Sequence, residues 1–394
     1  MTSRPLWLIG LFAATLALGT DEFVIAGLLP EIASDLGVSL GTAGQLVTVF
    51  ALAFALGAPV MGVLLDPYPR RRVLLGGLAV FALVNAAAVV APSFAVLAGL
   101  RAAAGLSAAV VSATSFAIAS QAAPSGKQGG YLATVTAGLT VALFTGVPTG
   151  AWIGGRFGWR STFVLIAIVA VAVMMVLAWR LPHLPGAPRL GLGARLLPLC
   201  SSRVSRLVLA VFFAGSGGLM FYSYLAPITD RIHGSTEPLP AILLLVGVIG
   251  VPSAFLGGWL ADTYGSRRSR LAVVGGHAAA LGILTVLVAW SAPLWAFLIG
   301  IALWSAFAWA LNPPLQASTI EAAPESAMTA VSLNISGLYL GTAVAGGLGG
   351  IIVDGFGEVW IPPIAALLLT AAWISAAYRT PEHKTTSTNP QQRR

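Results

Sequence analysis

Long apolar runs separated by short polar stretches recur along the whole chain. Each run is about 20 residues, enough to cross a hydrocarbon core of roughly 30 Å as a helix. The pattern predicts twelve membrane-spanning helices, at residues 7–29, 43–65, 73–91, 94–121, 131–154, 161–181, 206–229, 239–261, 270–290, 293–320, 327–353 and 359–378.

Composition supports an integral membrane protein. Hydrophobic residues make up 57% of the 394 and charged residues only 9%, against roughly 25% charged in a soluble domain. The first apolar run is too long for a signal-peptide core, and we expect it to be retained as a helix. No soluble domain is expected.

The net charge of +8 does not indicate nucleic-acid binding, because most basic residues fall in alternate loops and at the two ends. The positive-inside rule makes those loops cytoplasmic. We therefore expect both termini inside and a multi-pass membrane protein that contacts lipid and no nucleic acid.

A duplicated loop divides the chain. Six residues near the second predicted helix recur at a constant displacement near the eighth: Gly62, Leu64, Asp66, Tyr68, Arg71 and Arg72 match Gly258, Leu260, Asp262, Tyr264, Arg267 and Arg268. Such parallel repeats are known in secondary transporters. We expect an all-α membrane protein of two pseudo-symmetric six-helix bundles, 1–181 and 206–378, with a cytoplasmic linker at 182–205 and a disordered tail at 379–394.

The repeated loop resembles the signature cytoplasmic loop of the major facilitator superfamily. Its first copy departs from that signature at Pro67 and Pro69, and its second copy at Thr263. The resemblance implies that Asp66 and the arginines of each loop close the cytoplasmic side when the transporter is open outward. The alternative is that Arg70, Arg71 and Arg72 only fix the topology.

Three ionisable residues interrupt predicted helices: Asp21, Glu22 and Arg101. Such residues are costly inside a membrane and are usually functional. Glu22 and Arg101 each lie about seven residues, or about 10 Å, from the outer end of their helices, so they could face one another. Asp21 and Glu22 point about 100° apart, which indicates separate roles. An acid beside an arginine stays ionised, so moving the arginine could load or discharge a proton.

The stretch around Glu22 resembles the first helix of bacterial drug:proton antiporters, including amphenicol and sugar-efflux relatives. That resemblance makes Glu22 the first choice for the proton-binding residue, with Asp21 assisting. The segment LRAAAG resembles the fourth-helix motif of the family and implies that Arg101 modulates proton transfer. The alternatives are a buried acid that only locks two helices together and a structural Arg101 salt bridge.

The fifth predicted helix carries glycines at every fourth position, Gly146, Gly150 and Gly154, with Pro148 among them. They form one smooth ridge. The ridge resembles the antiporter motif of exporters, although Val147 separates the usual Gly-Pro pair, and it favours export over import. Plain helix packing is the alternative, and it is preferred for a similar ridge at 337–349.

The resemblance implies a substrate cavity between the halves. Its candidate lining groups are Tyr222, Tyr224, Trp309, Asn312 and Asn334, which would suit a small, partly apolar molecule; packing is the alternative for each. The single cysteine, Cys200, and four scattered histidines predict no disulfide and no metal site. His277 is expected to be a packed helix residue.

We expect a proton-coupled efflux antiporter, working as a monomer by alternating access, with no cofactor beyond the proton gradient. Nothing in the sequence indicates an enzyme. The alternatives are a sugar or metabolite efflux permease, a ligand-binding membrane sensor without net transport, a passive uniporter, and sodium in place of the proton.

Overall fold

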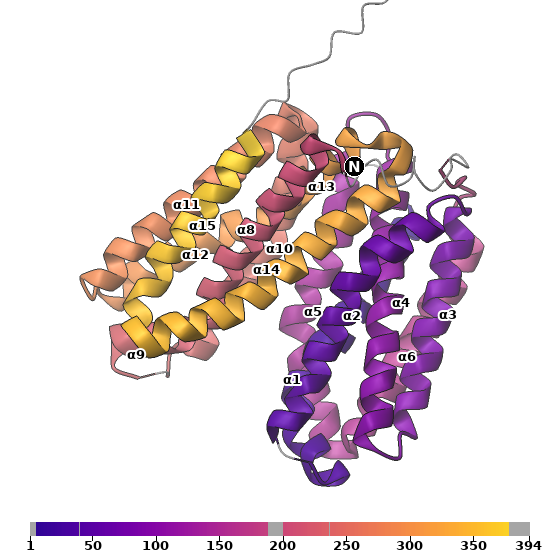
Figure 1. The fold of residues 1–394 in the computed structure, drawn as a ribbon, viewed down its shortest axis with the longest axis horizontal. Coiled ribbons are helices and arrows are strands. Elements are labelled where there is room, and N and C mark those ends of the chain that lie inside the picture. Colours follow the sequence, from indigo (N-terminus) through magenta and orange to yellow (C-terminus); the bar gives the residue numbers. More distant parts are fainter. Residues whose placement is uncertain (1–4, 39, 188–199, 236, 378–394) are drawn as a thin grey trace, which may run out of the picture.

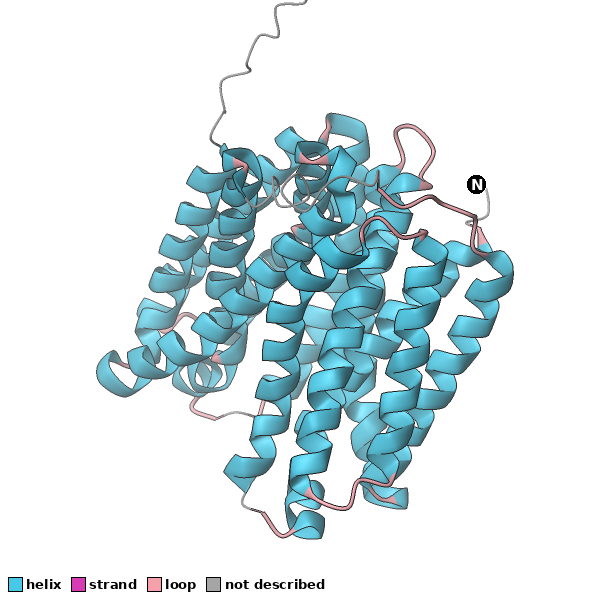
Figure 2. Cartoon of the chain, turned by 45° about the vertical axis from the view of Figure 1, so that its right-hand side comes forward, coloured by secondary structure: helices cyan, strands magenta, loops and turns pink. Residues whose placement is uncertain are grey.

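The first half of the chain folds into six long helices. The computed structural model describes residues 5–38, 40–187, 200–235 and 237–377, and these contain helices and loops but no strand (Figure 2). The helices of the first half are α1 (Leu6–Leu36), α2 (Leu40–Leu65), α3 (Arg70–Val89), α4 (Phe94–Gln121), α5 (Gln128–Phe157) and α6 (Trp159–Arg180).

The second half contains more and shorter helices. These are α8 (Ser202–Ser223), α9 (Leu225–His233), α10 (Leu239–Tyr264), α11 (Ser266–Ala289), α12 (Leu294–Ala310), α13 (Asn312–Ala322), η1 (Pro324–Ser326), α14 (Ala327–Phe356), η2 (Glu358–Trp360) and α15 (Ile361–Ala377). Each predicted apolar segment coincides with one helix or with two consecutive helices, which confirms the all-α membrane fold.

Eleven stretches of the described chain are long and apolar enough to span a membrane. The remaining predicted span, 131–154, coincides with α5, a helix of 30 residues whose side chains are described only in part.

Two predicted spans are interrupted, and prolines account for both breaks. α8 gives way to α9 at Tyr224, three residues before Pro227, which lacks the N–H that would bond to the Ser223 carbonyl. α12 gives way to α13 at Leu311, just before the pair Pro313 and Pro314. Each of these three prolines removes a helical hydrogen bond and favours a break nearby.

The helices gather into two bundles. One, α1–α6, surrounds a core that includes Phe50, Phe81, Phe116 and Phe163, and the other, α8–α15, surrounds a second core. The bundles meet at one end and diverge toward the other (Figure 1). We call the end where they meet the closed end. The first core also takes in Met328 and its neighbours from the start of α14, so the core of the first bundle continues into the second at the closed end.

The division between the halves lies between α6 and α8. Residues 181–187 follow α6 without helical structure, whereas 188–199 lie outside the described residues. The predicted tail at 379–394 also lies outside them.

Candidate transport site

A buried ion pair joins α1 to α4. Arg101 Nη1 lies 2.8 Å from Asp21 Oδ1, and Arg101 Nη2 donates to the Asp21 backbone carbonyl at 3.3 Å. Both residues are at most 1% exposed. The guanidinium also lies over the ring of Phe50 in α2, 4.3 Å from its centroid, an arrangement that attracts a cation to the face of the ring.

One carboxylate oxygen of Asp21 takes no part in the ion pair, which uses the other oxygen. Asp21 Oδ2 is buried and accepts no hydrogen bond from any described residue. Because an ionised carboxylate can accept several hydrogen bonds, Asp21 has unused capacity for a proton or a water molecule at this position. The Asp21–Arg101 ion pair therefore leaves one carboxylate oxygen of Asp21 without a hydrogen-bond donor among the described residues.

Glu22 faces the other bundle. Tyr339 in α14 donates its hydroxyl to Glu22 Oε2 at 2.6 Å, and its ring stacks on Phe54 of α2 with centroids 4.4 Å apart. Glu22 is half-buried. The two adjacent carboxylates thus have separate partners, as their angular separation predicts. Arg101, predicted from its depth to face Glu22, pairs instead with Asp21, and Glu22 bonds to Tyr339 of the opposite half.

A second bond between the two halves, from α14 to α2, depends on a proline. Pro59 lacks an N–H, so the carbonyl of Ala55, four residues earlier, has no helical partner. Ser336 Oγ of α14 donates to that carbonyl. The Ala55 carbonyl, which Pro59 leaves without a partner in α2, is therefore hydrogen-bonded by a side chain of the other half.

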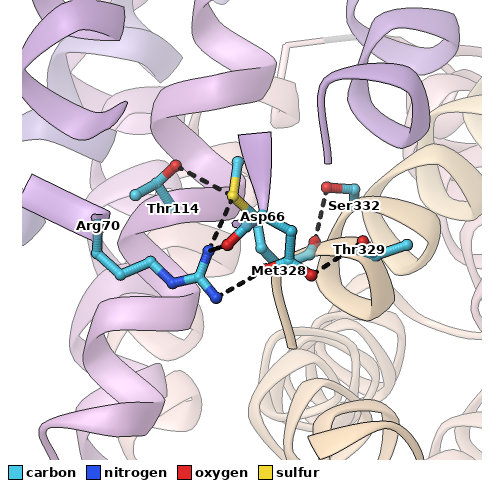
Figure 3. Close-up of polar contacts among 6 residues, drawn as sticks. All are labelled: Asp66, Arg70, Thr114, Met328, Thr329 and Ser332. Carbon is cyan, nitrogen blue, oxygen red and sulfur yellow. Dashed lines mark hydrogen bonds and ion pairs between the residues drawn. The ribbon is translucent and has the colours of Figure 1, made fainter. Parts of the chain in front are cut away.

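The closed end is held by a buried cluster around Asp66, shown in Figure 3. Arg70 Nη2 lies 2.7 Å from Asp66 Oδ1, and Thr329 of α14 donates to Asp66 Oδ2 at 3.1 Å. The Arg70 guanidinium also lies 3.5 Å from the sulfur of Met328 in α14. We call Asp66, Arg70 and Thr329 the Asp66 latch, since they tie the end of α2 to the start of α14.

Gly62 allows this approach. A Cβ at this position would lie 2.4 Å from Ser332 Oγ and 3.3 Å from the Cα of Thr329. Only a residue without a side chain lets α2 and α14 come this close.

Asp262, the repeat-related counterpart of Asp66, makes the equivalent contact from the second half to the first. Asp262 in α10 accepts hydrogen bonds from the backbone N–H groups of Gly129 and Gly130 at 2.5 and 2.8 Å. These amides belong to the first turn of α5, where a carboxylate is favourable. Gly258 and Gly129 pack directly on one another. Each acid of the duplicated loop therefore lies at the start of a helix from the opposite half.

The repeated arginines lie outside these contacts. Arg71 donates to the Ala178 carbonyl at the end of α6 and contacts His183, and Arg72, Arg267 and Arg268 are exposed. The arginine that completes the latch is Arg70, which has no counterpart in the second loop, where Ser266 occupies the position. Asp66 and Arg70 lie only four residues apart in sequence, across the turn between α2 and α3, and this closeness is the sequence signal for the pair.

Comparison with known proteins decides the family. A sequence model described as "Major Facilitator Superfamily" matches residues 11–332. The chain belongs to the Major Facilitator Superfamily. It is 32% identical over 359 residues to an uncharacterized MFS-type transporter, YbcL, of Bacillus subtilis (strain 168), covering 91% of each chain.

A further relative and a solved structure agree. The chain is 32% identical over 268 residues to a chloramphenicol resistance protein of Streptomyces lividans, covering 66% of this chain and 67% of that protein. The structure of the proton:xylose symporter XylE superimposes with a TM-score of 0.77 at 17% identity, over 93% of this chain and 94% of that one, and shows a shared fold. The protein is thus a multi-pass membrane transporter of the superfamily.

The five candidate substrate residues all lie in the second half, and four of them hydrogen-bond to or pack against other residues of that half. Tyr224 donates to the Gly346 carbonyl at 2.8 Å, and Asn334 is buried and donates to Thr319 at 3.0 Å. Tyr222 stacks on Trp304, with ring centroids 6.4 Å apart. Trp309 packs against Gly250, and Asn312 begins α13.

The two glycine ridges pack against neighbouring helices where they are described. Gly146, Pro148 and Gly150 lie within α5, in a part whose side chains lie outside the described residues. At Gly154 a Cβ would lie 2.2 Å from Leu28 of α1. On α14, Gly341 faces the backbone of Phe212 in α8. The packing interpretation of that second ridge is confirmed.

The described residues contain no group of three or more His, Cys, Asp or Glu side chains that could hold a metal ion. His277 is buried against Gly218 and Trp304, and Cys200 is exposed.

Proposed function

We propose that this transporter exchanges an incoming proton for an outgoing small, partly apolar molecule, by alternating access in the inner membrane of a bacterium. One observation carries the proposal. Of two adjacent carboxylates in α1, Asp21 is paired inside its own bundle with Arg101, while Glu22 bonds to Tyr339 of the opposite bundle. A titratable group at the contact between the halves can couple proton binding to their movement.

The coupling follows from the chemistry of this bond. A hydrogen bond to an ionised carboxylate is roughly twice as strong as one between neutral groups. Ionised Glu22 therefore favours the state in which Tyr339 contacts it, and a proton on Glu22 weakens that contact. The protonated halves then rock apart at the closed end, the proton leaves, and cargo binds before the return.

Orientation follows from charge. The closed end carries the loops with Arg70, Arg71 and Arg72 and with Arg267 and Arg268, which the positive-inside rule assigns to the cytoplasm. In this assignment the structure is closed to the cytoplasm, and both termini are cytoplasmic. Glu22 then receives its proton from outside, in the direction of the proton gradient.

Two observations support export over import. The chain resembles a chloramphenicol resistance protein over two thirds of its length, and α5 carries the glycine spacing of the exporter motif at Gly146, Gly150 and Gly154. Aromatic groups of the second bundle, among them Tyr222 and Trp309, support the proposed cargo class, because they suit an apolar molecule with a few hydrogen-bonding groups.

The test uses purified protein in liposomes that contain a pH-sensitive dye. An imposed proton gradient is challenged with amphenicols, lipophilic drugs and sugars, for the wild type, Glu22→Gln and Asp21→Asn. Glu31→Gln is the matched control, since it removes a carboxylate from the same helix about 13 Å further along. We expect one class of compound to collapse the gradient with the wild type and the control, but not with Glu22→Gln.

Each other outcome corrects a specific part of the proposal. Cargo movement without proton flux in the wild type contradicts antiport. Loss of coupling in Asp21→Asn but not in Glu22→Gln would show that the proton binds at Asp21, beside Arg101, and not at Glu22. A response to sugars alone replaces drug export by sugar efflux with the same coupling.

A further inference from the structure

A pocket lies beside the Asp66 latch but takes no part in it. Its volume is about 480 Å³, and it is lined by Arg71, Arg72 and Leu75 of α3, by His183 and Leu184, and by two prolines, Pro69 and Pro185. The pocket thus combines three basic side chains with an apolar wall.

The charges of the pocket are all of one sign. No carboxylate is among the described residues that line it. Arg71 Nη1 lies 2.9 Å from His183 Nε2, and because a guanidinium can only donate, the ring nitrogen must accept. Arg71 Nε is buried and has no hydrogen-bond partner among the described residues. Because that atom is buried, it offers no donor to a ligand, and what the pocket presents is the unneutralised positive charge of Arg71 and Arg72.

The wall of the pocket is preformed. The backbone N–H of Arg70 donates to the Leu184 carbonyl at 3.2 Å, and the N–H of Ala187 donates to the Asp66 carbonyl at 2.8 Å. Gly186 packs directly on the carbonyl of Pro67. The segment that carries His183 and Leu184 is therefore fixed to the loop between α2 and α3, and a ligand need not order it on binding.

The helices that flank the pocket have apolar outer faces. On α6 the side chains of Trp179 and Met175 are 81% and 51% exposed, and on α3 Leu83 is 70% exposed. Exposed apolar side chains on membrane-spanning helices face lipid chains, and tryptophan is enriched at the level of lipid headgroups. The pocket therefore lies where a headgroup can enter it while its acyl chains lie along α3 and α6.

We infer that this pocket binds the phosphate of an anionic phospholipid through Arg71, Arg72 and His183. Guanidinium groups match the geometry of phosphate oxygens, and basic pockets between membrane helices are suited to anionic headgroups. The leucines and prolines of the wall contact the glycerol and the first methylenes of the chains.

The test compares two pairs of arginines. Delipidated full-length protein in a neutral detergent is titrated with dioctanoyl phosphatidylglycerol, dioctanoyl phosphatidylcholine or inorganic phosphate at fixed ionic strength, and binding is counted by native mass spectrometry. Arg71→Gln/Arg72→Gln is compared with the matched control Arg267→Gln/Arg268→Gln. The control removes the same charge from the repeat-related loop, where both arginines are exposed and none of them lines this pocket.

We expect the wild type and the control to bind phosphatidylglycerol equally and above phosphatidylcholine. The pocket variant should lose affinity by about 25-fold, because each of its two arginines near an anionic headgroup contributes about fivefold. Since Arg71 also donates to the Ala178 carbonyl, Arg72→Gln alone is the variant that leaves that contact intact. It should lose about fivefold by the same reasoning.

Three results would overturn the inference. Equal loss in the two double variants shows only a general attraction to the basic end of the molecule. Unchanged affinity in both Arg72→Gln and the pocket double variant shows that the lipid binds elsewhere. Inorganic phosphate that binds as tightly as phosphatidylglycerol shows a site for a soluble anion, with no part for the acyl chains.

Discussion

The close approach of α2 and α14 at Gly62 predicts that a single added methyl group opens the closed end. A Cβ at this position would lie 2.8 Å from Ser332 Cβ as well as 2.4 Å from Ser332 Oγ. Carbon atoms in contact are normally about 3.5–4.0 Å apart, so α14 must move away by about 1 Å in Gly62→Ala. Rotation of the serine cannot relieve the contact with its Cβ.

The magnitude follows from the cost of overpacking. Inserting a methyl group into a well-packed contact typically costs about 1–3 kcal/mol. The cost falls only on the state in which α2 and α14 touch, because the contact is absent once the halves separate. The ratio of open to closed molecules should therefore rise by about 5- to 150-fold.

The assay is a distance measurement between spin labels on the two halves. Tyr68 and Tyr264 are repeat-related, lie at the closed end and are 54% and 53% exposed, so cysteine at either position accepts a label without burying it. The background is Cys200→Ser, which removes the only cysteine of the chain. Gly62→Ala should shift the distance distribution toward longer separations in liposomes.

Two comparisons make the result decisive. Gly76→Ala on α3 is the matched control, because a Cβ there meets nothing within 4 Å. Gly62→Ala/Ser332→Gly should restore the wild-type distribution, since it removes the side chain that the new methyl group meets. A wild-type distribution in Gly62→Ala, or a failure of the second substitution to restore it, would refute the reasoning.

Two further predictions concern the ion pairs of α1. Arg101→Gln leaves the buried Asp21 carboxylate without its partner, which costs about 3–5 kcal/mol of stability. The double variant Asp21→Asn/Arg101→Gln should recover most of the lost thermal stability in detergent. A double variant as unstable as the single one would contradict this account. Near the other end of α1, hydrogen bonds from Arg160 and Trp159 hold the pKa of Asp35 below its usual value. Its contribution to stability is therefore present above about pH 4, the ordinary carboxyl pKa, and is lost as the pH falls through the lower folded value. Asp35→Asn should lower the melting temperature at pH 7, with a difference that disappears in acid; a difference independent of pH would show that the charge of Asp35 is irrelevant.

The helical fold was predictable because hydropathy is a strong signal in a membrane. The errors in the predicted helix ends and breaks have physical causes. α1 continues to Leu36, well past the predicted end at residue 29, because the last turns carry Glu31 and Asp35 and leave the apolar layer while remaining helical. The breaks at Tyr224 and Leu311 fall inside apolar runs, where hydropathy does not register the lost hydrogen bonds of nearby prolines.

The site was only partly predictable. Asp21, Glu22 and Arg101 stand out because charges are rare in such helices, and their depth and angular spacing follow from helix geometry. The partner of Glu22 does not follow, because Tyr339 is one of seven tyrosines and its selection depends on how two distant halves dock. The repeat does not single out Arg70 among the arginines of the first loop, because Ser266 stands at the equivalent position of the second loop.

The bond from Ser336 to the Ala55 carbonyl has a consequence for the solvent. When the halves separate, that carbonyl loses its partner, and the helix cannot supply another because Pro59 has no N–H. A bare carbonyl in a hydrocarbon setting costs several kcal/mol. Opening at the closed end therefore requires water to reach the level of Ala55, so hydration of this one position sets how deep the open pathway must extend.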